Sequence, residues 1–502
     1  MNGREKSDSS IVPEKSPNKP AEARKREEGA EAMEGRGLAK GNPSGHDTHR
    51  TQSRERVESG LERVREAARR DKELRFTALM HHIYDVERLR DAYFRLNKDA
   101  AAGVDGVTWK AYGEELETNI RALADRLKRG AYRASPARRA TISKQNGGER
   151  HLGVPTLEDK LVQRATVEVL NEIYEQDFLG FSYGFRPGRG QHDALDSLAV
   201  GLHEKKVRWV LDADIRGFFD TLNHEWLAKF IEHRIGDRRV VRLIQKWLKA
   251  GVLADGEHIA GTVGTVQGGS ISPLLANIYL HYVLDLWADQ WRKRHAHGEV
   301  IIVRYADDFV VGFYHREDGE RFQAALRQRL AEFGLELHPD KTRMIEFGRF
   351  AATNRAQRGE GKGESFVFLG LRHIYARTRR GRATLWRLTS RKSFRAGLRE
   401  IKATLQRCSW WKIPQMGKYL AAALEGHYAY FGVPNNSRLL WAFRHAVVWL
   451  WKRALERRSE RTRVKWTRME RLAARWIPPA KIRHPHPSER FAVRTRGRSR
   501  MR

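Results

Sequence analysis

Two short apolar runs on either side of an acidic pair mark the middle of the chain. Residues 299–313 read EVIIVRYADDFVVGF, with apolar positions at 300–303 and 309–311. This pattern predicts a β-hairpin of two buried strands with Asp307 and Asp308 at its tip. Adjacent carboxylates repel each other, so at the mouth of a core they need a cation to offset their charge. Taken alone, the stretch fits a solvated turn equally well, because Asp is common in turns.

A second apolar run also ends in acids. Residues 208–215 read RWVLDADI, and Asp212 and Asp214 fall on one face of the strand that this run predicts. If both acid-tipped strands join one sheet, three carboxylates converge there and would hold a pair of magnesium ions (Mg2+) about 3.5–4 Å apart. That arrangement supports in-line attack of a hydroxyl on a phosphoryl group, so the predicted chemistry is nucleotidyl transfer.

Apolar spacing elsewhere predicts helices and one more hairpin. Residues 140–155 fit a hairpin with an Asn-Gly-Gly turn and the cations Lys144 and Arg150 at its strand ends. Helical periodicity predicts helices over 75–96, 157–174, 191–203, 272–286 and 321–333, and three basic, apolar-striped helices beginning near residues 393, 416 and 438. The fold class expected is therefore α+β with a helical C-terminal part.

Composition and charge indicate the kind of partner. Residues 1–70 are rich in Lys, Arg, Glu, Ser, Gly and Pro, so we expect a disordered basic segment; only Leu61, Val64 and Ala67 form a thin stripe where a helix would start. The net charge of +33 and pI of about 10.4 favour a polyanion, and nucleic acid fits best. No apolar run reaches the ~20 residues that span a bilayer and no signal peptide is visible, so no membrane partner is expected.

Five motifs in fixed order carry a resemblance to a known family. They are ADIRGFFD at 213–220, VQGGSISPLLAN at 266–277, RYADD at 304–308, LHPDKT at 337–342 and FLGL at 368–371. Together they resemble the successive blocks of a reverse transcriptase palm of the kind that group II introns encode. The resemblance covers about residues 76–373, and a weaker one continues to about 480, where GHYAYFGVPNNSRLLW at 426–441 is similar to the X or maturase domain.

The resemblance implies an architecture and a set of catalytic residues. It implies a right-hand polymerase with fingers and palm over 71–373, a helical thumb and maturase domain over 374–480, and a basic tail over 481–502. By resemblance Asp214, and not Asp212, joins Asp307 and Asp308 as a catalytic carboxylate and magnesium ligand, with the backbone carbonyl of Ile215 as a further ligand. Phe219 then stands where the family has the aromatic ring that excludes a ribose 2′-hydroxyl, which predicts a preference for dNTPs.

Substrate contacts follow from the same resemblance. Lys144 and Arg150 are assigned to the nucleotide triphosphate, Gln267 to the incoming nucleotide, and Lys341 to the primer-strand phosphates. Arg186, in SYGFRPGRG at 182–190, is the candidate for contact with the template backbone. For the hairpin cations the alternative is a solvated basic surface, and for Arg186 it is a salt-bridged surface arginine. The family pattern has Pro where this chain has Val266, a departure that affects the rigidity of the turn.

The function that these features imply is an RNA-directed DNA polymerase that copies intron RNA and assists group II intron splicing and mobility. The expected partners are the intron RNA, a DNA target or primer and dNTPs, in a bacterial cytoplasm near the nucleoid; a homodimer stays open. Alternatives are a splicing-only maturase, which the intact carboxylates argue against, and a stand-alone reverse transcriptase of a defence or diversification system, which the block at 426–441 argues against. The single cysteine, Cys408, excludes an internal disulfide, and without a Cys pair no C-terminal endonuclease is expected.

Overall fold

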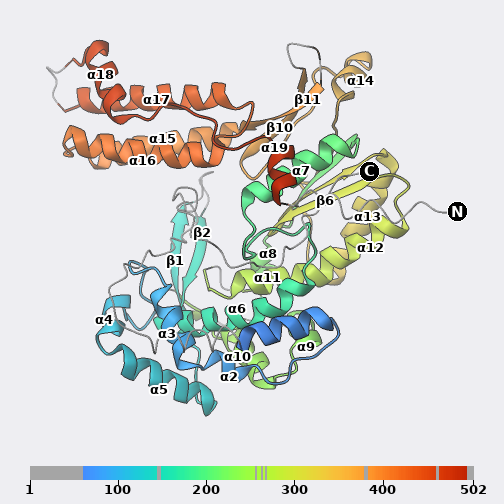
Figure 1. The fold of residues 1–502 in the computed structure, drawn as a ribbon, viewed down its shortest axis with the longest axis vertical. Coiled ribbons are helices and arrows are strands. Elements are labelled where there is room, and N and C mark those ends of the chain that lie inside the picture. The colour runs from blue at the N-terminus through green and yellow to red at the C-terminus, as the bar shows by residue number, and fades with distance from the viewer. Residues whose placement is uncertain are drawn as a thin grey trace.

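The computed structural model describes residues 60–494 except for 144–148, 255–256, 260, 262–263, 266–267, 378–380, 382 and 459–462. Figure 1 shows three bodies. Helices and a long hairpin lie at the lower left, a sheet flanked by helices lies at the right, and a helical bundle lies at the top. We refer to them as the hairpin body, the sheet body and the bundle.

The hairpin body combines the first described residues with one helix and two short strands from later in the chain. The predicted hairpin over 140–155 is confirmed: its strands are antiparallel, with Ile142 opposite Arg150. The elements of this body are α2 (Met80–Ile83), α3 (Val86–Phe94), α4 (Trp109–Glu114), α5 (Leu116–Lys128), α6 (Leu157–Asp177), α10 (Arg238–Lys249) and a sheet ordered β2 (Glu149–Val154), β1 (Ala137–Ser143), β4 (Val252–Ala254), β5 (Glu257–Ile259).

The sheet body is built on four antiparallel strands, and both predicted acid-tipped runs are among them. The strand order is β6 (Val300–Tyr305), β7 (Asp308–Phe313), β3 (Trp209–Asp214), β8 (Arg343–Glu346). Its helical elements are α7 (Gln191–Glu204), α8 (Phe218–Thr221), α9 (His224–Arg234), α11 (Ser272–Leu280), the π-helical turn η2 (His281–Asp285), α12 (Leu286–Arg294), α13 (Arg316–Glu332) and α14 (Ala351–Gln357).

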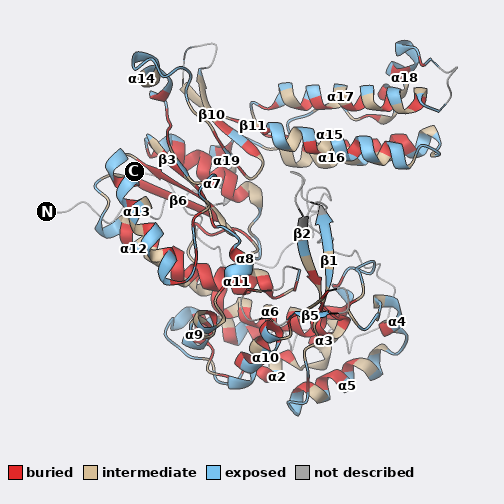
Figure 2. Cartoon of the chain, turned by 180° about the vertical axis from the view of Figure 1, so that it is seen from behind, coloured by how far each residue is buried: buried red, intermediate tan, exposed pale blue. Residues whose placement is uncertain are grey.

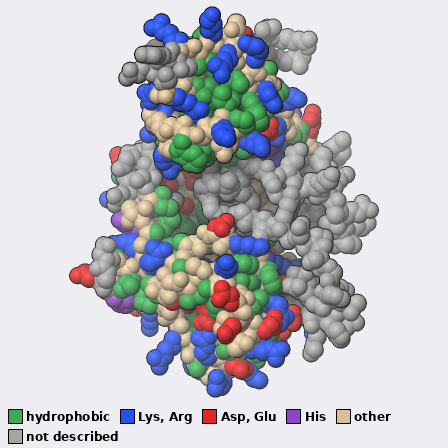
Figure 3. All heavy atoms as spheres, turned by 90° about the vertical axis from the view of Figure 1, so that its left-hand side faces the viewer, with side chains coloured by type: hydrophobic (Ala, Val, Ile, Leu, Met, Phe, Trp, Pro, Cys, Tyr) green, Lys and Arg blue, Asp and Glu red, His purple; other side chains and the backbone are tan. Residues whose placement is uncertain are grey.

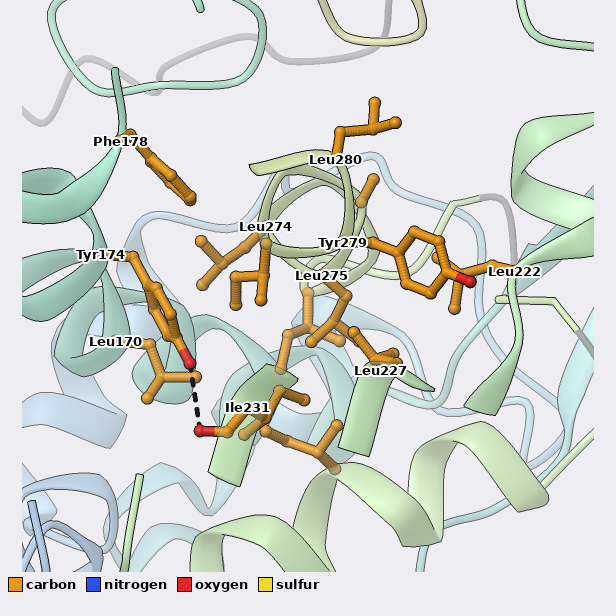
Figure 4. Packing of buried hydrophobic residues seen from close by; sticks show 14 of the residues in the cluster. Leu170, Tyr174, Phe178, Leu222, Leu227, Ile231, Leu274, Leu275, Tyr279 and Leu280 are labelled. Carbon is orange, nitrogen blue, oxygen red and sulfur yellow. Dashed lines mark hydrogen bonds between the residues drawn. The ribbon is translucent and has the colours of Figure 1, made fainter. Parts of the chain in front are cut away.

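Strands β6 and β7 are buried on both faces, which explains why their sequences are continuous apolar runs without alternation. Ile302 and Val311 belong to the larger hydrophobic cluster, whereas Ile301 and Val303 belong to a second cluster on the opposite face. Figure 2 shows these strands in the colour of buried residues. Figure 4 shows the larger cluster, where residues of α6, α9 and α11 pack together. Strands held from both sides give the acids at their ends a rigid support.

A small sheet links the sheet body to the bundle. Its order is β11 (Ala383–Thr389), β10 (Leu371–Arg377), β9 (Phe366–Phe368). The bundle has its own hydrophobic core and consists of α15 (Arg391–Arg407), α16 (Ile413–Phe431), α17 (Ser437–Glu456) and α18 (Trp466–Trp476), and α19 (Pro487–Arg494) follows. The three predicted C-terminal helices are thus confirmed as α15, α16 and α17. No helix in the described ranges is long and apolar enough to cross a bilayer.

Four predictions about the extent of segments differ from the structure. Residues 60–70, placed in the disordered segment, form a helix that buries Leu61, Val64 and Ala68 in the larger cluster. The predicted helix over 75–96 is broken into α2 and α3. The predicted all-helical region from 374 begins inside the β10–β11 hairpin, and part of the predicted tail is α19, which packs against α7 through an ion pair of 3.3 Å between Arg490 and Asp196.

Candidate active site

A two-residue turn carries the acidic pair, as the sequence predicts. Tyr305 pairs with Asp308 across the hairpin, so only Ala306 and Asp307 form the turn. Ala306 has a φ of 57°, in the left-handed region, which costs a residue with a Cβ about 1–2 kcal/mol. The neighbouring structure must therefore hold this turn in place.

Strand pairing brings the second acid-tipped run to the same place. β3 lies beside β7, and Asp214 is directly opposite Asp308. Burial raises the pKa of Asp308 well above its usual range, and the carboxylates of Asp212, Asp214 and Asp307 raise it further. The two acid-tipped strands thus meet in one sheet, and Asp308 lies in a site whose charge needs a cation to offset it.

Two side-chain cations offset part of this negative charge. The Lys341 ammonium forms an ion pair with Asp214, although Lys341 was assigned to primer phosphates; its side chain is 60% exposed. Arg343 lies 3.6 Å from Asp212, whose pKa is nevertheless raised to about 6, chiefly by burial. Asp214 is therefore paired with an exposed lysine, whereas Asp212 faces an arginine that also donates to the Ser365 carbonyl at 3.0 Å.

The donor set fits hard divalent cations, which bind carboxylate and carbonyl oxygens. Within the described ranges no three Asp, Glu, His or Cys side chains already stand as a ligand cluster. The fit rests instead on the like charges that raise the pKa of Asp308, since a cation there would offset them. Ile215 forms an isolated β-bridge with Leu337. The hydrogen bonds of this bridge involve its neighbours: the Asp214 carbonyl accepts the His338 N–H, and the Arg216 N–H donates to the Glu336 carbonyl.

Comparison with known proteins agrees with this geometry. The family model described as "Reverse transcriptase (RNA-dependent DNA polymerase)" matches residues 142–373, which include all of these acids. Protein YkfC of Escherichia coli is 34% identical over 351 residues, which are 62% of this chain and 86% of that protein. The chain belongs to the reverse transcriptase family.

Other relatives of this reverse transcriptase are intron-encoded. The group II intron-encoded protein LtrA of Lactococcus lactis is 37% identical over 231 residues, 45% of this chain but only 38% of LtrA. A putative COX1/OXI3 intron 1 protein of Saccharomyces cerevisiae is 24% identical over 400 residues, 70% of this chain and 47% of that protein. The resemblance to group II intron reverse transcriptases is confirmed, and with it RNA-directed DNA polymerase activity.

The loop before α11 lies against the Phe219 backbone. Thr265 donates its N–H to the Phe219 carbonyl at 2.8 Å, and a Cβ on Gly264 would lie 2.8 Å from the same oxygen. The Phe219 side chain is half-buried beside the larger cluster. Gln267, two residues after Thr265, lies outside the described residues. The described part of this loop thus contacts the backbone that carries the Phe219 ring, and the assignments of Phe219 and Gln267 stay predictions.

The two cations predicted at the strand ends of the β1–β2 hairpin are only partly described. Arg150 lies on β2, and its backbone pairs with Ile142, but its side chain is outside the described residues. Lys144, which follows β1 in the sequence, also lies outside them. Their assignment to the triphosphate therefore stays a prediction.

Arg186, assigned to nucleic acid, is instead a buried structural residue. Its Nε donates to Glu175 at 2.8 Å, and its Nη1 donates to the carbonyls of Leu179 and Ser182, each at 2.7 Å. Its side chain is completely buried. A guanidinium paired in this way has no surface to offer a template, so the SYGFRPGRG loop is held by Arg186 and does not present it.

Sequence reasoning missed the buried polar groups behind the acidic turn. Arg304 on β6 is completely buried and contacts Asp285, Asn277 and the Ala306 carbonyl. The signal that points to it is an arginine within the otherwise apolar VIIVRY, because a charge in a buried strand requires a partner. The partners lie on α11 and η2, which the sequence predicted only as one continuous helix.

Proposed function

We propose that Asp214, Asp307 and Asp308, with the Ile215 carbonyl, hold two magnesium ions with which the enzyme extends a DNA primer on group II intron RNA. The observation that carries this proposal is the register that sets Asp214 opposite Asp308 and raises the pKa of Asp308. In this proposal the sheet body is the palm, the hairpin body is the fingers, and the bundle is the thumb and maturase domain.

The residues have distinct tasks in the proposed reaction. Bound magnesium would stabilise the charge that develops on the transferred phosphoryl group and activate the primer hydroxyl. The carboxylates would hold and orient the magnesium ions at the end of a sheet that is buried on both faces. Lys341 leaves Asp214 when that carboxylate serves as a ligand, and its exposed ammonium then reaches the primer-strand phosphates.

The nucleotide is bound from the hairpin body and the loop before α11. Lys144 and Arg150 suit triphosphate oxygens as a point charge and a fork. Gln267 contacts the base-paired nucleotide, and Phe219 packs under its sugar, so dNTPs are preferred. The contact of Thr265 with the Phe219 carbonyl supports this placement, since it ties the loop to the backbone that carries the ring.

Intron RNA is bound by the bundle, whose exposed face on α17 alternates cations and aromatic rings. This stripe, defined here as the α17 stripe, is made of Arg438, Trp441, His445, Trp449 and Arg453. The indoles of Trp441 and Trp449 are 63% and 42% exposed, and the Arg453 guanidinium lies 4.6 Å from the Trp449 ring centroid. Figure 3 shows Lys and Arg side chains around exposed hydrophobic groups on the upper body.

Exposed indoles beside guanidinium groups suit RNA that presents unpaired bases and phosphates together. Bases of any identity stack on an aromatic ring, and guanidinium groups bind phosphates. The intron origin of the relatives supports intron RNA as the ligand. Binding of this RNA by the bundle would stabilise its folded form, which is the physical basis for assistance in splicing.

The test is primer extension on an RNA template by Asp307→Asn and Asp308→Asn. We expect both variants to lose magnesium-dependent extension while RNA affinity stays within about twofold, because phosphate contacts come from Lys and Arg elsewhere. Asp91→Asn, on α3 of the hairpin body, is the matched control and should extend at the wild-type rate. Wild-type rates in either active-site variant would overturn the assignment.

A further inference from the structure

The tip of the catalytic hairpin is fastened from behind by a buried polar cluster. Arg304 donates from Nε and Nη2 to the two carboxylate oxygens of Asp285, at 2.7 and 2.5 Å. Its Nη1 donates to the Asn277 amide oxygen at 3.0 Å and to the Ala306 carbonyl at 2.9 Å. Because the last of these acceptors belongs to the strained turn itself, Arg304 connects the helix α11–η2 to the backbone that carries Asp307.

Asn277 extends the cluster to a second segment. Its amide donates to the Gly184 carbonyl at 2.8 Å, and a Cβ on Gly184 would lie only 2.3 Å from the Ala306 N atom. The Arg304 backbone is held by the same segment: its N–H donates to Phe181 and its carbonyl accepts from Tyr183, each at 2.9 Å. The turn is thus clamped between residues 181–184 and Arg304.

The π-helical turn explains how Asn277 and Asp285 reach the same guanidinium. Eight residues separate them, which in a regular α-helix turns one about 80° away from the other around the axis. The five residues His281–Asp285 form a wider π turn, which reduces this difference, and both side chains contact Arg304. Burial lowers the pKa of His281 to about 4, so this ring in the same turn stays neutral and does not compete with Arg304 for Asp285.

We propose that Arg304, Asp285 and Asn277 are positioning residues that set the geometry of the Ala306–Asp307 turn, and through it the metal affinity and rate of the polymerase. This inference rests on the proposed function of Asp307 and Asp308. Arg304 touches neither substrate nor metal, since it is completely buried behind the turn. Its planar fork makes four hydrogen bonds at once, which a lysine ammonium of the same charge does not reproduce.

The experiment compares Arg304→Lys with Arg234→Lys. Arg234 is a matched control because it is also buried, pairs with Asp177 at 2.8 Å and donates to the Leu74 carbonyl at 2.7 Å, but it lies at the end of α9 and neither partner belongs to the acidic turn. Three quantities are measured: the thermal midpoint, Mn2+ binding without nucleotide by electron paramagnetic resonance, and the extension rate as a function of magnesium concentration.

We expect both lysine variants to lower the thermal midpoint, but only Arg304→Lys to weaken Mn2+ binding about tenfold and slow extension by roughly 10²-fold, the scale of a 1 Å misplacement of reacting groups. Asn277→Ala removes a side chain without leaving a buried charge unpaired, and it should show the same pattern in weaker form. This variant provides the test if Arg304→Lys does not fold.

Two other outcomes would contradict the positioning role or the proposed function, and they can be told apart. Equal effects of Arg304→Lys and Arg234→Lys, or wild-type Mn2+ binding and extension in folded Asn277→Ala, would overturn the positioning role while leaving the proposed function intact. Wild-type protein that neither binds Mn2+ nor extends a primer would overturn the proposed function itself.

Discussion

At the scale of single residues, burial separates the groups that stabilise the fold from those that serve chemistry. Arg304 is completely buried, but Asp285 and Asn277 satisfy its donors, and losing one partner of such a pair costs about 3–5 kcal/mol. Asp308 is surrounded mainly by other carboxylates. A buried group whose neighbours oppose its charged form is destabilising for the fold alone, so its presence indicates a functional role.

Phe219 is predicted to select the sugar of the incoming nucleotide. Replacement by Ala removes the ring that would clash with a 2′-hydroxyl, so the ratio of rNTP to dNTP incorporation should rise at least tenfold. The measurement is single-nucleotide extension with matched rNTP and dNTP pairs. Phe219→Tyr keeps the ring and should keep the wild-type ratio. A ratio unchanged in Phe219→Ala would mean that another side chain excludes the ribose.

At the scale of elements, the sequence predicted what local patterns determine. The acid-tipped strands, the β1–β2 hairpin and the long helices follow from apolar periodicity and turn residues within a short window. The start of α2 at Met80 does not, because it depends on distant partners: the Asp237 carboxylate accepts the N–H groups of Leu79 and Met80, each at 2.9 Å, and Phe76 pairs with Ile235.

The residues of the candidate site also divide into those that local sequence patterns predict and those that depend on distant partners. The acids were predictable, because strand ends and the resemblance both mark them. The burial of Arg186 was not, since its partner Glu175 lies on a preceding helix whose packing the sequence does not specify. The same is true of Arg304, which contacts both Asn277 and Asp285 where a π turn replaces a regular helical turn.

Within the bundle, His427 is predicted to make stability depend on pH. Its ring stacks on Phe443 at 3.7 Å, and burial lowers its pKa to about 3. In the unfolded chain the pKa is about 6.5, so below that pH the unfolded state takes up a proton that the folded state does not. Stability is therefore fully present above pH 6.5 and falls as the pH drops toward 3, by about 1.4 kcal/mol at pH 5.5.

His427→Phe should remove this share of the pH dependence. Urea denaturation followed by tryptophan fluorescence at pH 8 and pH 5.5 measures it, and the loss of stability between the two should be smaller in the variant by about 1.4 kcal/mol. His486→Gln alters an exposed histidine and should leave the difference unchanged. The same pH dependence in His427→Phe and wild type would show that the buried ring does not resist protonation.

At the scale of the whole molecule, the bundle is tied to the sheet body from both ends of its chain. The β10–β11 hairpin leads into it, and α19 returns to α7, where Arg490 contacts Asp196 and Asp196 also contacts Arg387 at 2.6 Å. Deleting everything after residue 390 would remove these contacts along with the cationic surface. Substitutions on the α17 stripe therefore test RNA binding more directly than truncation does.

The last prediction is that the α17 stripe binds intron RNA by stacking and by charge. Trp449→Ala should weaken binding roughly 5–100-fold, since stacking on one aromatic ring contributes about 1–3 kcal/mol per base. Arg453→Gln should reduce the slope of log affinity against log salt concentration by about 1, because one phosphate contact is lost. Filter binding of the full-length protein to intron RNA at several salt concentrations measures both effects.

Phe350→Ala and Arg349→Gln are matched controls on the sheet body. Phe350 is 56% exposed, and the Arg349 guanidinium lies 5.8 Å from its ring centroid. Extension of a short primer on a short template should stay at the wild-type rate in all four variants, since the acidic turn is unchanged. If the α17 variants bind intron RNA no worse than these controls, the bundle is not the RNA-binding surface, and assistance in splicing loses its structural basis.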